Sequence, residues 1–232
     1  MSLQDWYPLA LSRDIAAGTS AGTRVLGDEF VVWRDSKGAV HAWEDRCPHR
    51  GMKMSFGFVR GDHIACLYHG WQYDTAGQCR HIPAHPDLEV PQTIKIPRFA
   101  TTEAGGMIWG CFNGEDSATP PAPELPTEVT PLRSVYADCP APQMVAQITK
   151  TAFGETTPDV TSRTDRTIDI TLGDTKLIAG VQTIADGESA LHLVALGAVD
   201  ASKLKPLSLW AEQLRRDAET AAQTGATAEI AA

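Results

Sequence analysis

The sequence has no excess of positive charge. Its 20 Lys and Arg residues are outnumbered by 29 Asp and Glu residues, which gives a formal net charge of −9. Nucleic-acid binding depends on basic side chains that neutralise phosphates, so nucleic acid is excluded as an expected partner. The composition is instead typical of a globular chain with an acidic, well-solvated surface.

Long apolar runs and a leader pattern are also lacking. No run approaches the roughly 18 apolar residues of a membrane-spanning helix, so no membrane association is expected. The N-terminus carries Asp5 and no basic segment, which argues against a secretory signal. Five cysteines are present, and three remain once Cys47 and Cys66 are assigned as ligands below. An odd remainder indicates reduced thiols and a cytoplasmic location.

Two short segments rich in cysteine, histidine and glycine are present instead. The first reads Cys-Pro-His-Arg-Gly from residue 47, and the second reads Cys-Leu-Tyr-His-Gly-Trp from residue 66. The candidate ligands are Cys47, His49, Cys66 and His69. Two thiolates and two imidazoles are the ligand set of a Rieske [2Fe-2S] centre. Zinc is the alternative, although the common structural zinc spacings fit these segments poorly.

The two segments resemble the Rieske domain of the Rieske non-haem iron oxygenases, which hydroxylate rings or demethylate substrates. Their pattern is C-x-H-R-G followed by C-x-Y-H-G-W, and this chain departs from it at Leu67, where proline is usual. The resemblance extends over residues 6–110. It implies that the cysteines bind a buried iron and the histidines an outer iron. The residues that it places around the cluster are Arg50, Gly51, Tyr68, Gly70 and Trp71.

The sequence pattern of residues 1–114 predicts an antiparallel β domain. Short β-branched and aromatic runs, separated by Gly and Asp turns, indicate strands at 23–26, 29–34, 39–43, 57–59, 63–65, 72–74, 79–83 and 105–112. His41 is expected to be a strand residue rather than a ligand. Cys79, His81 and His85 are a possible second metal site, but the nearby prolines favour an irregular surface loop.

The rest of the chain predicts a connector and a small second domain. Residues 115–142 contain seven prolines, which predicts an extended connector without regular structure. Residues 143–232 predict a small antiparallel sheet with strands at 144–149, 167–172, 176–184 and 190–196. A helix is expected over 206–222, starting at Pro206, with a frayed tail from Thr220. The fold class is therefore mostly β, with a Rieske-type domain followed by an α+β domain.

The resemblance also indicates what this chain does not contain. The oxygenases hold a second, mononuclear iron with two histidines and one carboxylate in a larger C-terminal domain. After His85 this chain has one histidine, His192, and one histidine cannot complete that set. The second domain resembles a reduced form of the oxygenase domain, suited to docking and assembly.

The most favoured function is an electron-transfer component of an oxygenase-type redox system. It would take single electrons from a flavin- or ferredoxin-type reductase and pass them to a separate oxygenase subunit. Whether the chain is itself an oxidoreductase enzyme stays open. One alternative is a complete oxygenase, with iron ligands from a partner chain or with an unfamiliar set such as His192 with Asp165 or Asp169. A homotrimer, which the larger relatives often form, is a possible oligomeric state in either case. The other is a non-catalytic redox sensor or binding module.

Overall fold

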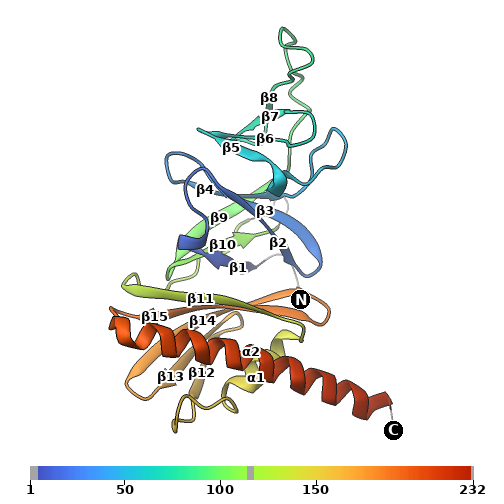
Figure 1. Cartoon of the computed structure of the whole chain (residues 1–232). Helices are drawn as coiled ribbons and strands as arrows, with labels where there is room; N and C mark the ends of the chain where they lie inside the picture. Colours follow the sequence, from blue (N-terminus) through green and yellow to red (C-terminus); the bar gives the residue numbers. More distant parts are fainter. Residues whose placement is uncertain (1–4, 114–117, 231–232) are drawn as a thin grey trace. The chain divides into compact units, whose positions relative to one another are not determined.

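The computed structural model describes residues 5–113 and 118–230, with side chains described as far as residue 224. The chain divides into two compact units, which Figure 1 shows by sequence colour. The first unit comprises Met1–Glu103 with Ile108–Pro123, and the second comprises Ala104–Met107 with Glu124–Ala232. No helix in the described part of the chain is long and apolar enough to cross a membrane.

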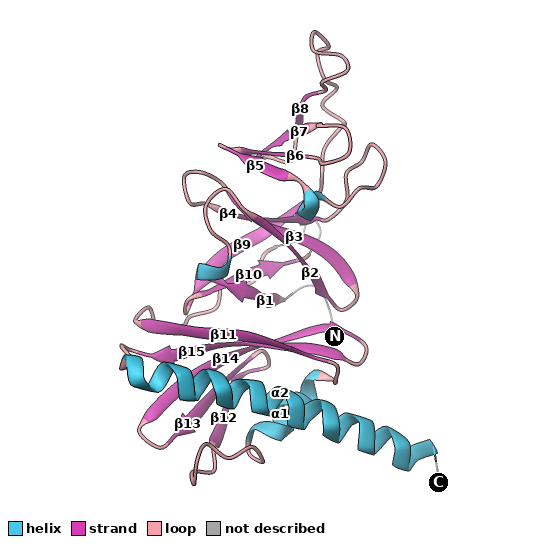
Figure 2. Cartoon of the chain, viewed as in Figure 1, coloured by secondary structure: helices cyan, strands magenta, loops and turns pink. Residues whose placement is uncertain are grey.

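The first unit contains two sheets and two short 3-10 helices, η1 (Ser12–Asp14) and η2 (Met54–Phe56). The larger sheet has the order β1-β10-β9-β4-β3-β2. Its strands are β1 (Trp6–Leu11), β2 (Ser20–Val25), β3 (Asp28–Arg34), β4 (Val40–Glu44), β9 (Arg98–Ala104) and β10 (Met107–Cys111). The smaller sheet has the order β5-β6-β7-β8, and Figure 2 shows how short its strands are. These are β5 (Phe58–Arg60), β6 (His63–Ala65), β7 (Gln72–Asp74) and β8 (Cys79–His81).

Both faces of strand β3 are buried. Successive side chains of a strand point to opposite faces of its sheet. Val31 and Trp33 therefore pack into one hydrophobic cluster, together with the side chains of both ligand loops. Phe30 and Val32 pack into a second cluster on the other face. The larger sheet thus packs against the two loops that carry the candidate ligands, residues 47–52 and 66–71, which we call the ligand loops.

The second unit is a five-stranded antiparallel sheet with two α-helices among its described residues. The strand order is β11-β15-β14-β13-β12. The strands are β11 (Val129–Ala137), β12 (Asp159–Thr164), β13 (Thr167–Leu172), β14 (Thr175–Ala185) and β15 (Glu188–Leu196), and the helices are α1 (Ala141–Ile148) and α2 (Ala201–Ile230).

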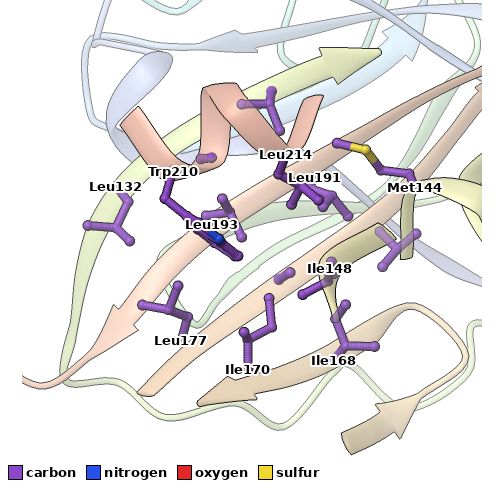
Figure 3. Packing of buried hydrophobic residues seen from close by; sticks show 14 of the residues in the cluster. Leu132, Met144, Ile148, Ile168, Ile170, Leu177, Leu191, Leu193, Trp210 and Leu214 are labelled. Carbon is purple, nitrogen blue, oxygen red and sulfur yellow. The ribbon is translucent and has the colours of Figure 1, made fainter. Parts of the chain in front are cut away.

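Helix α2 closes the core of the second unit. Trp210 points from the helix toward Leu193 of β15, and Leu214 toward Leu191 of the same strand, as Figure 3 shows. The indole N–H of Trp210 donates to the carbonyl of Thr151 at 2.9 Å, so this buried polar group is satisfied. These contacts fix one stripe of the helix against the sheet.

The expected fold class, mostly β with a C-terminal helix, is confirmed. Three local predictions are wrong. Residues 144–149 do not form a strand but lie mostly in helix α1, which begins after Pro140. The proline-rich stretch 115–142 is not wholly irregular, because it contains strand β11. Helix α2 begins at Ala201 rather than at Pro206, and it continues to Ile230 instead of fraying from residue 220.

Candidate metal centre

The two ligand loops share one backbone pattern. In the first loop the N–H of Cys47 donates to the carbonyl of Met52, and in the second the N–H of Cys66 donates to the carbonyl of Trp71. The N–H of the glycine four residues on (Gly51 or Gly70) donates back to the cysteine carbonyl, and all four distances are 2.8–2.9 Å. Both glycines have φ near +70°, at 74° and 70°, in the left-handed region that favours glycine. The sequence therefore folds into two matching tight turns.

The smaller sheet brings the two loops together. Strand β5 pairs antiparallel with β6, so that Phe58 lies opposite Ala65, directly before Cys66. Strand β6 pairs with β7, so that Ala65 lies opposite Gln72, directly after the second loop. The second loop is thus the tight connection between two paired strands, and the two candidate cysteines pack in one hydrophobic cluster.

The thiols lie at the buried end of the site. Cys47 is 2% exposed and Cys66 is 3% exposed. Burial raises the pKa of the Cys66 thiol, and the neighbouring Cys47 raises it further. The hydroxyl oxygen of Tyr73, on β7, lies 3.2 Å from Sγ of Cys47. The sequence did not single out Tyr73, because nothing local marks it as a partner of a cysteine 26 residues away.

The imidazoles lie at the surface end of the site. His49 is half-buried and His69 is exposed, and their ring centroids are 4.6 Å apart. Each ring stacks on an aromatic side chain, His49 on Trp71 at 4.2 Å and His69 on Tyr68 at 3.9 Å. Burial lowers the pKa of His49, and the neighbouring His69 and Arg50 lower it further. The two rings therefore lie next to each other, each against an aromatic side chain, and the His69 ring is open to solvent.

The candidate second site shows no metal-binding geometry. Cys79 is buried on β8, and its Sγ lies 3.8 Å from the carbonyl oxygen of His81.

His41 is a residue of strand β4, and its Nε2 lies 3.1 Å from a carboxylate oxygen of Asp35. Across residues 5–113 and 118–230, no three or more His, Cys, Asp or Glu side chains are grouped to hold one metal ion. A Rieske centre does not require such a group, because each of its irons takes two protein ligands.

His192 does not lie with the acidic residues named as its possible partners. Its Nδ1 lies 2.8 Å from the Ser134 hydroxyl, and its Nε2 lies 2.8 Å from the side-chain oxygen of Gln182. Asp169 belongs to β13, which strand β14 separates from the β15 strand of His192. Asp165 lies in the turn between β12 and β13. Burial lowers the pKa of His192 to about 4.

The donor set of the two loops fits a Rieske cluster. Two buried thiols and two surface imidazoles converge from matching turns, which is the division of ligands that such a cluster needs. A family model described as the Rieske [2Fe-2S] domain matches residues 5–96. Residues 5–96 form a Rieske domain. This domain binds a [2Fe-2S] cluster, and the relatives that it matches include the oxygenase subunits of 3-chlorobenzoate-3,4-dioxygenase and phthalate 4,5-dioxygenase.

Two relatives show how far the sequence similarity extends. The chain is 37% identical over 110 residues to the oxidoreductase NdmD of Pseudomonas putida, covering 47% of this chain and 19% of that protein. It is 35% identical over 131 residues to 4beta-methylsterol monooxygenase of Methylococcus capsulatus, covering 55% of this chain and 34% of that protein. The chain thus spans about a fifth of the first relative's length and about a third of the second's.

The similarity of fold extends beyond the Rieske domain. A structure of dicamba monooxygenase bound to dicamba superposes with a TM-score of 0.76, covering 99% of this chain and 90% of that chain at 17% identity. At this identity the comparison shows the fold alone. The second unit therefore shares its arrangement of sheet and helix with that enzyme.

Proposed function

We propose that Cys47, His49, Cys66 and His69 hold the cluster. In this arrangement the two cysteines bind the inner iron and the two histidines bind the outer iron. The burial of the thiols and the exposure of the imidazoles support this division. The bound cluster accepts and releases one electron at a time.

The surroundings of these ligands hold them in place. The stacking of His49 on Trp71 and of His69 on Tyr68 limits rotation of the rings. The hydroxyl of Tyr73 donates to the Cys47 thiolate, since a metal-bound thiolate carries no proton. The exposed edge of His69 then serves as the point where electrons enter and leave.

The chain functions as an electron-transfer component, and a separate protein supplies the catalytic iron. The observation that carries this proposal is the engagement of His192, the one histidine after His85. Both of its ring nitrogens lie within hydrogen-bonding distance of uncharged side chains of the same sheet, so neither is free for a second iron. A mononuclear oxygenase iron needs two histidines and a carboxylate. The names of the relatives, among them monooxygenases and demethylases, support an oxygenase as the final electron acceptor.

Iron and sulfide analysis of anaerobically purified protein tests both parts of the proposal. About two irons per chain are expected, all in the cluster, with the EPR signal of a reduced Rieske centre. His69→Ala should abolish this signal. His81→Ala is the matched control, because His81 lies outside the ligand set and should leave the signal intact.

Two results would refute the proposal in different ways. An unchanged Rieske signal in His69→Ala would refute the ligand assignment. A third, non-cluster iron that reacts with nitric oxide in EPR would refute the electron-transfer role and favour a complete oxygenase.

A further inference from the structure

A hollow with a volume of about 410 Å³ lies in the first unit. Its lining comes from the β2–β3 turn, strand β3, the end of strand β4, strand β9 and the residue after β10. The four proposed cluster ligands are not among the lining residues. Sites for small organic molecules typically measure about 300–1,000 Å³, so a small ligand fits this hollow.

Three phenylalanines form the apolar part of the lining. The rings of Phe30 and Phe112 stack with their centroids 3.8 Å apart. The centroid of the Phe99 ring lies 5.3 Å from that of Phe30 and 5.1 Å from that of Phe112. All three rings pack in one hydrophobic cluster, in which Phe99 stays partly exposed. The packing therefore fixes an aromatic surface against which a ligand can lie.

Two carboxylates flank Phe30 on the same face of the sheet. Asp28 precedes Phe30 by two residues on β3, and side chains two residues apart on a strand share a face. Glu44 lies directly opposite Phe30 in the β3–β4 pair, which places its side chain on that face too. The hollow therefore has acidic groups on two sides of its aromatic surface.

The turn before β3 holds Asp28 in position. Leu26 has a φ of 52°, in the left-handed region that residues other than glycine rarely adopt. Its side chain packs against the same hydrophobic cluster as Phe30. The next residue, Gly27, lines the hollow. Packing of the Leu26 side chain thus holds the turn, and with it the first residue of β3, in one conformation.

The carboxylates of Asp28 and Glu44 are available to a ligand. Neither forms an ion pair or a side-chain hydrogen bond within residues 5–113 and 118–230. The other two acidic residues of the lining already have partners: Glu29 with Lys53, and Asp45 with Ser55.

The charge and the apolar surface together select the class of ligand. The lining contains four acidic residues and one basic residue, Arg46, so an anion would be repelled. A neutral apolar molecule would leave the two available carboxylates without a partner. A cation with an apolar body satisfies both parts of the lining, because aromatic rings also attract cations.

We propose that this hollow binds a small organic cation with an aromatic body, of the arylalkylammonium class. The ammonium group lies between the carboxylates of Asp28 and Glu44, and the aromatic body packs on Phe99. Binding is reversible and involves no covalent or redox step. The site is therefore a binding function of the first unit in addition to the proposed electron transfer, and it does not depend on that function.

Isothermal titration calorimetry of the cluster-loaded chain tests this site. The probe is benzyltrimethylammonium, which should bind with a Kd of about 1 mM or below at low salt. Tetramethylammonium lacks the ring and benzyl alcohol lacks the charge, so each should bind at least about tenfold more weakly. Benzoate, which has the opposite charge, should give no binding heat. Added salt should weaken binding of the probe, because it screens the carboxylates.

Two variants and their matched controls locate the site. Glu44→Gln should weaken binding of the probe about fourfold at low salt. Glu89→Gln removes an exposed carboxylate of the same unit outside the hollow and should leave the affinity unchanged. Phe99→Leu should weaken binding about threefold at every salt concentration. Phe56→Leu makes the same change at an exposed ring outside the hollow and should have no effect.

The Rieske EPR signal of each variant shows whether the first unit is folded. Glu44→Gln changes a side chain at the surface of the hollow, so it tests the site even if Phe99→Leu disturbs the aromatic packing. Loss of probe affinity in Glu44→Gln with a normal EPR signal supports the proposed site.

The following outcomes would overturn the inference. Benzoate or benzyl alcohol binding as tightly as the probe would exclude the assigned ligand class. Equal effects of Glu44→Gln and Glu89→Gln would mean that the overall charge of the chain, and not the hollow, attracts the cation. Absence of probe binding, together with self-association that Glu44→Gln abolishes, would assign the hollow to contacts between copies of this chain.

Discussion

The hydroxyl of Tyr73 offers a direct test of how the site controls its reduction potential. Tyr73 is fully buried, and its oxygen lies 3.2 Å from Sγ of Cys47. Burial, followed by the neighbouring Cys47, raises the pKa of Tyr73 far above its ordinary value, so the hydroxyl keeps its proton. Tyr73→Phe removes this donor and leaves the ring in place. Reduction adds negative charge to the cluster, so a donor to sulfur stabilises the reduced form more than the oxidised form.

The expected size of the effect follows from the single hydrogen bond that is lost. A hydrogen bond to a charged group contributes about 1.5–3 kcal/mol, but only the difference between the two oxidation states changes the potential. The added electron is shared over the whole cluster, so we take this difference as about 1 kcal/mol. A tenfold change in an equilibrium constant corresponds to about 1.4 kcal/mol, or to about 59 mV for one electron. Tyr73→Phe should therefore lower the midpoint potential by about 40 mV.

Protein-film voltammetry or a redox titration followed by EPR measures this change. Tyr136→Phe is the matched control, because Tyr136 is an exposed residue of β11 in the second unit. Its midpoint potential should equal that of the wild-type chain. A midpoint in Tyr73→Phe that is unchanged or higher, with the Rieske signal intact, would refute the role given to this hydroxyl.

Three further predictions concern stability, measured by urea unfolding. Leu214→Ala should lower the free energy of unfolding by about 3 kcal/mol, because this side chain of helix α2 is fully buried in the core of the second unit; a loss below about 1 kcal/mol would contradict this packing. Arg34→Lys should lower the free energy of unfolding by about 2 kcal/mol, since Arg34 donates to three backbone carbonyls and to Glu103. A urea midpoint equal to that of the wild-type chain would show that those hydrogen bonds contribute nothing. Burial lowers the pKa of His192 in the folded chain to about 4, from an ordinary 6.5. Its contribution to the free energy of unfolding is therefore complete above pH 6.5 and is lost as the pH falls toward 4. The wild-type chain should lose up to about 3 kcal/mol over that range and His192→Gln clearly less, and parallel pH profiles would refute this.

The strands that the sequence predicted well are those with regular alternation and glycine turns. Residues 167–172 form β13 with the predicted bounds, and 176–184 lie within β14. In β13 the apolar side chains alternate with polar ones, so the two-residue period is visible in the sequence itself. Strand β14 is buried on both faces and reads instead as a nearly continuous run of buried residues between two glycine turns. Strand β12, with the sequence DVTSRT, is mostly exposed and therefore carries no such period.

The failures have identifiable physical causes. In residues 141–148 the buried side chains Ala141, Met144 and Ile148 recur at helical spacing, and the β-branched residues concealed this period. Pro131 lies in β11, which stands at the edge of its sheet, where a proline removes no essential hydrogen bond. Pro206 lies within the first turns of α2, and the start of that helix is set instead by Asp200, whose carboxylate accepts from the N–H of Ser202 at 2.8 Å.

The fold of the candidate site was predictable to a greater extent because the proposed ligands lie in two short segments. The order of Cys, His and Gly in each segment agrees with the tight turn that each one forms, while their role as cluster ligands stays a prediction. Tyr73 was not predictable, because its contact with Cys47 depends on how β7 packs on the first loop. The exposure of Phe58 and Leu67 was likewise hidden, since an apolar residue in a sequence is expected to be buried.

The matching turns also affect the stability of the first unit in the absence of metal. Each loop contributes one thiolate and one imidazole, so in the proposed arrangement each iron joins residues 47–49 to residues 66–69. The two irons then act as a double cross-link that closes a hairpin of short, three-residue strands. Metal binding of this kind adds directly to folding stability. Without iron, the chain should therefore open first in this region, and limited proteolysis of the metal-free chain should cut it there.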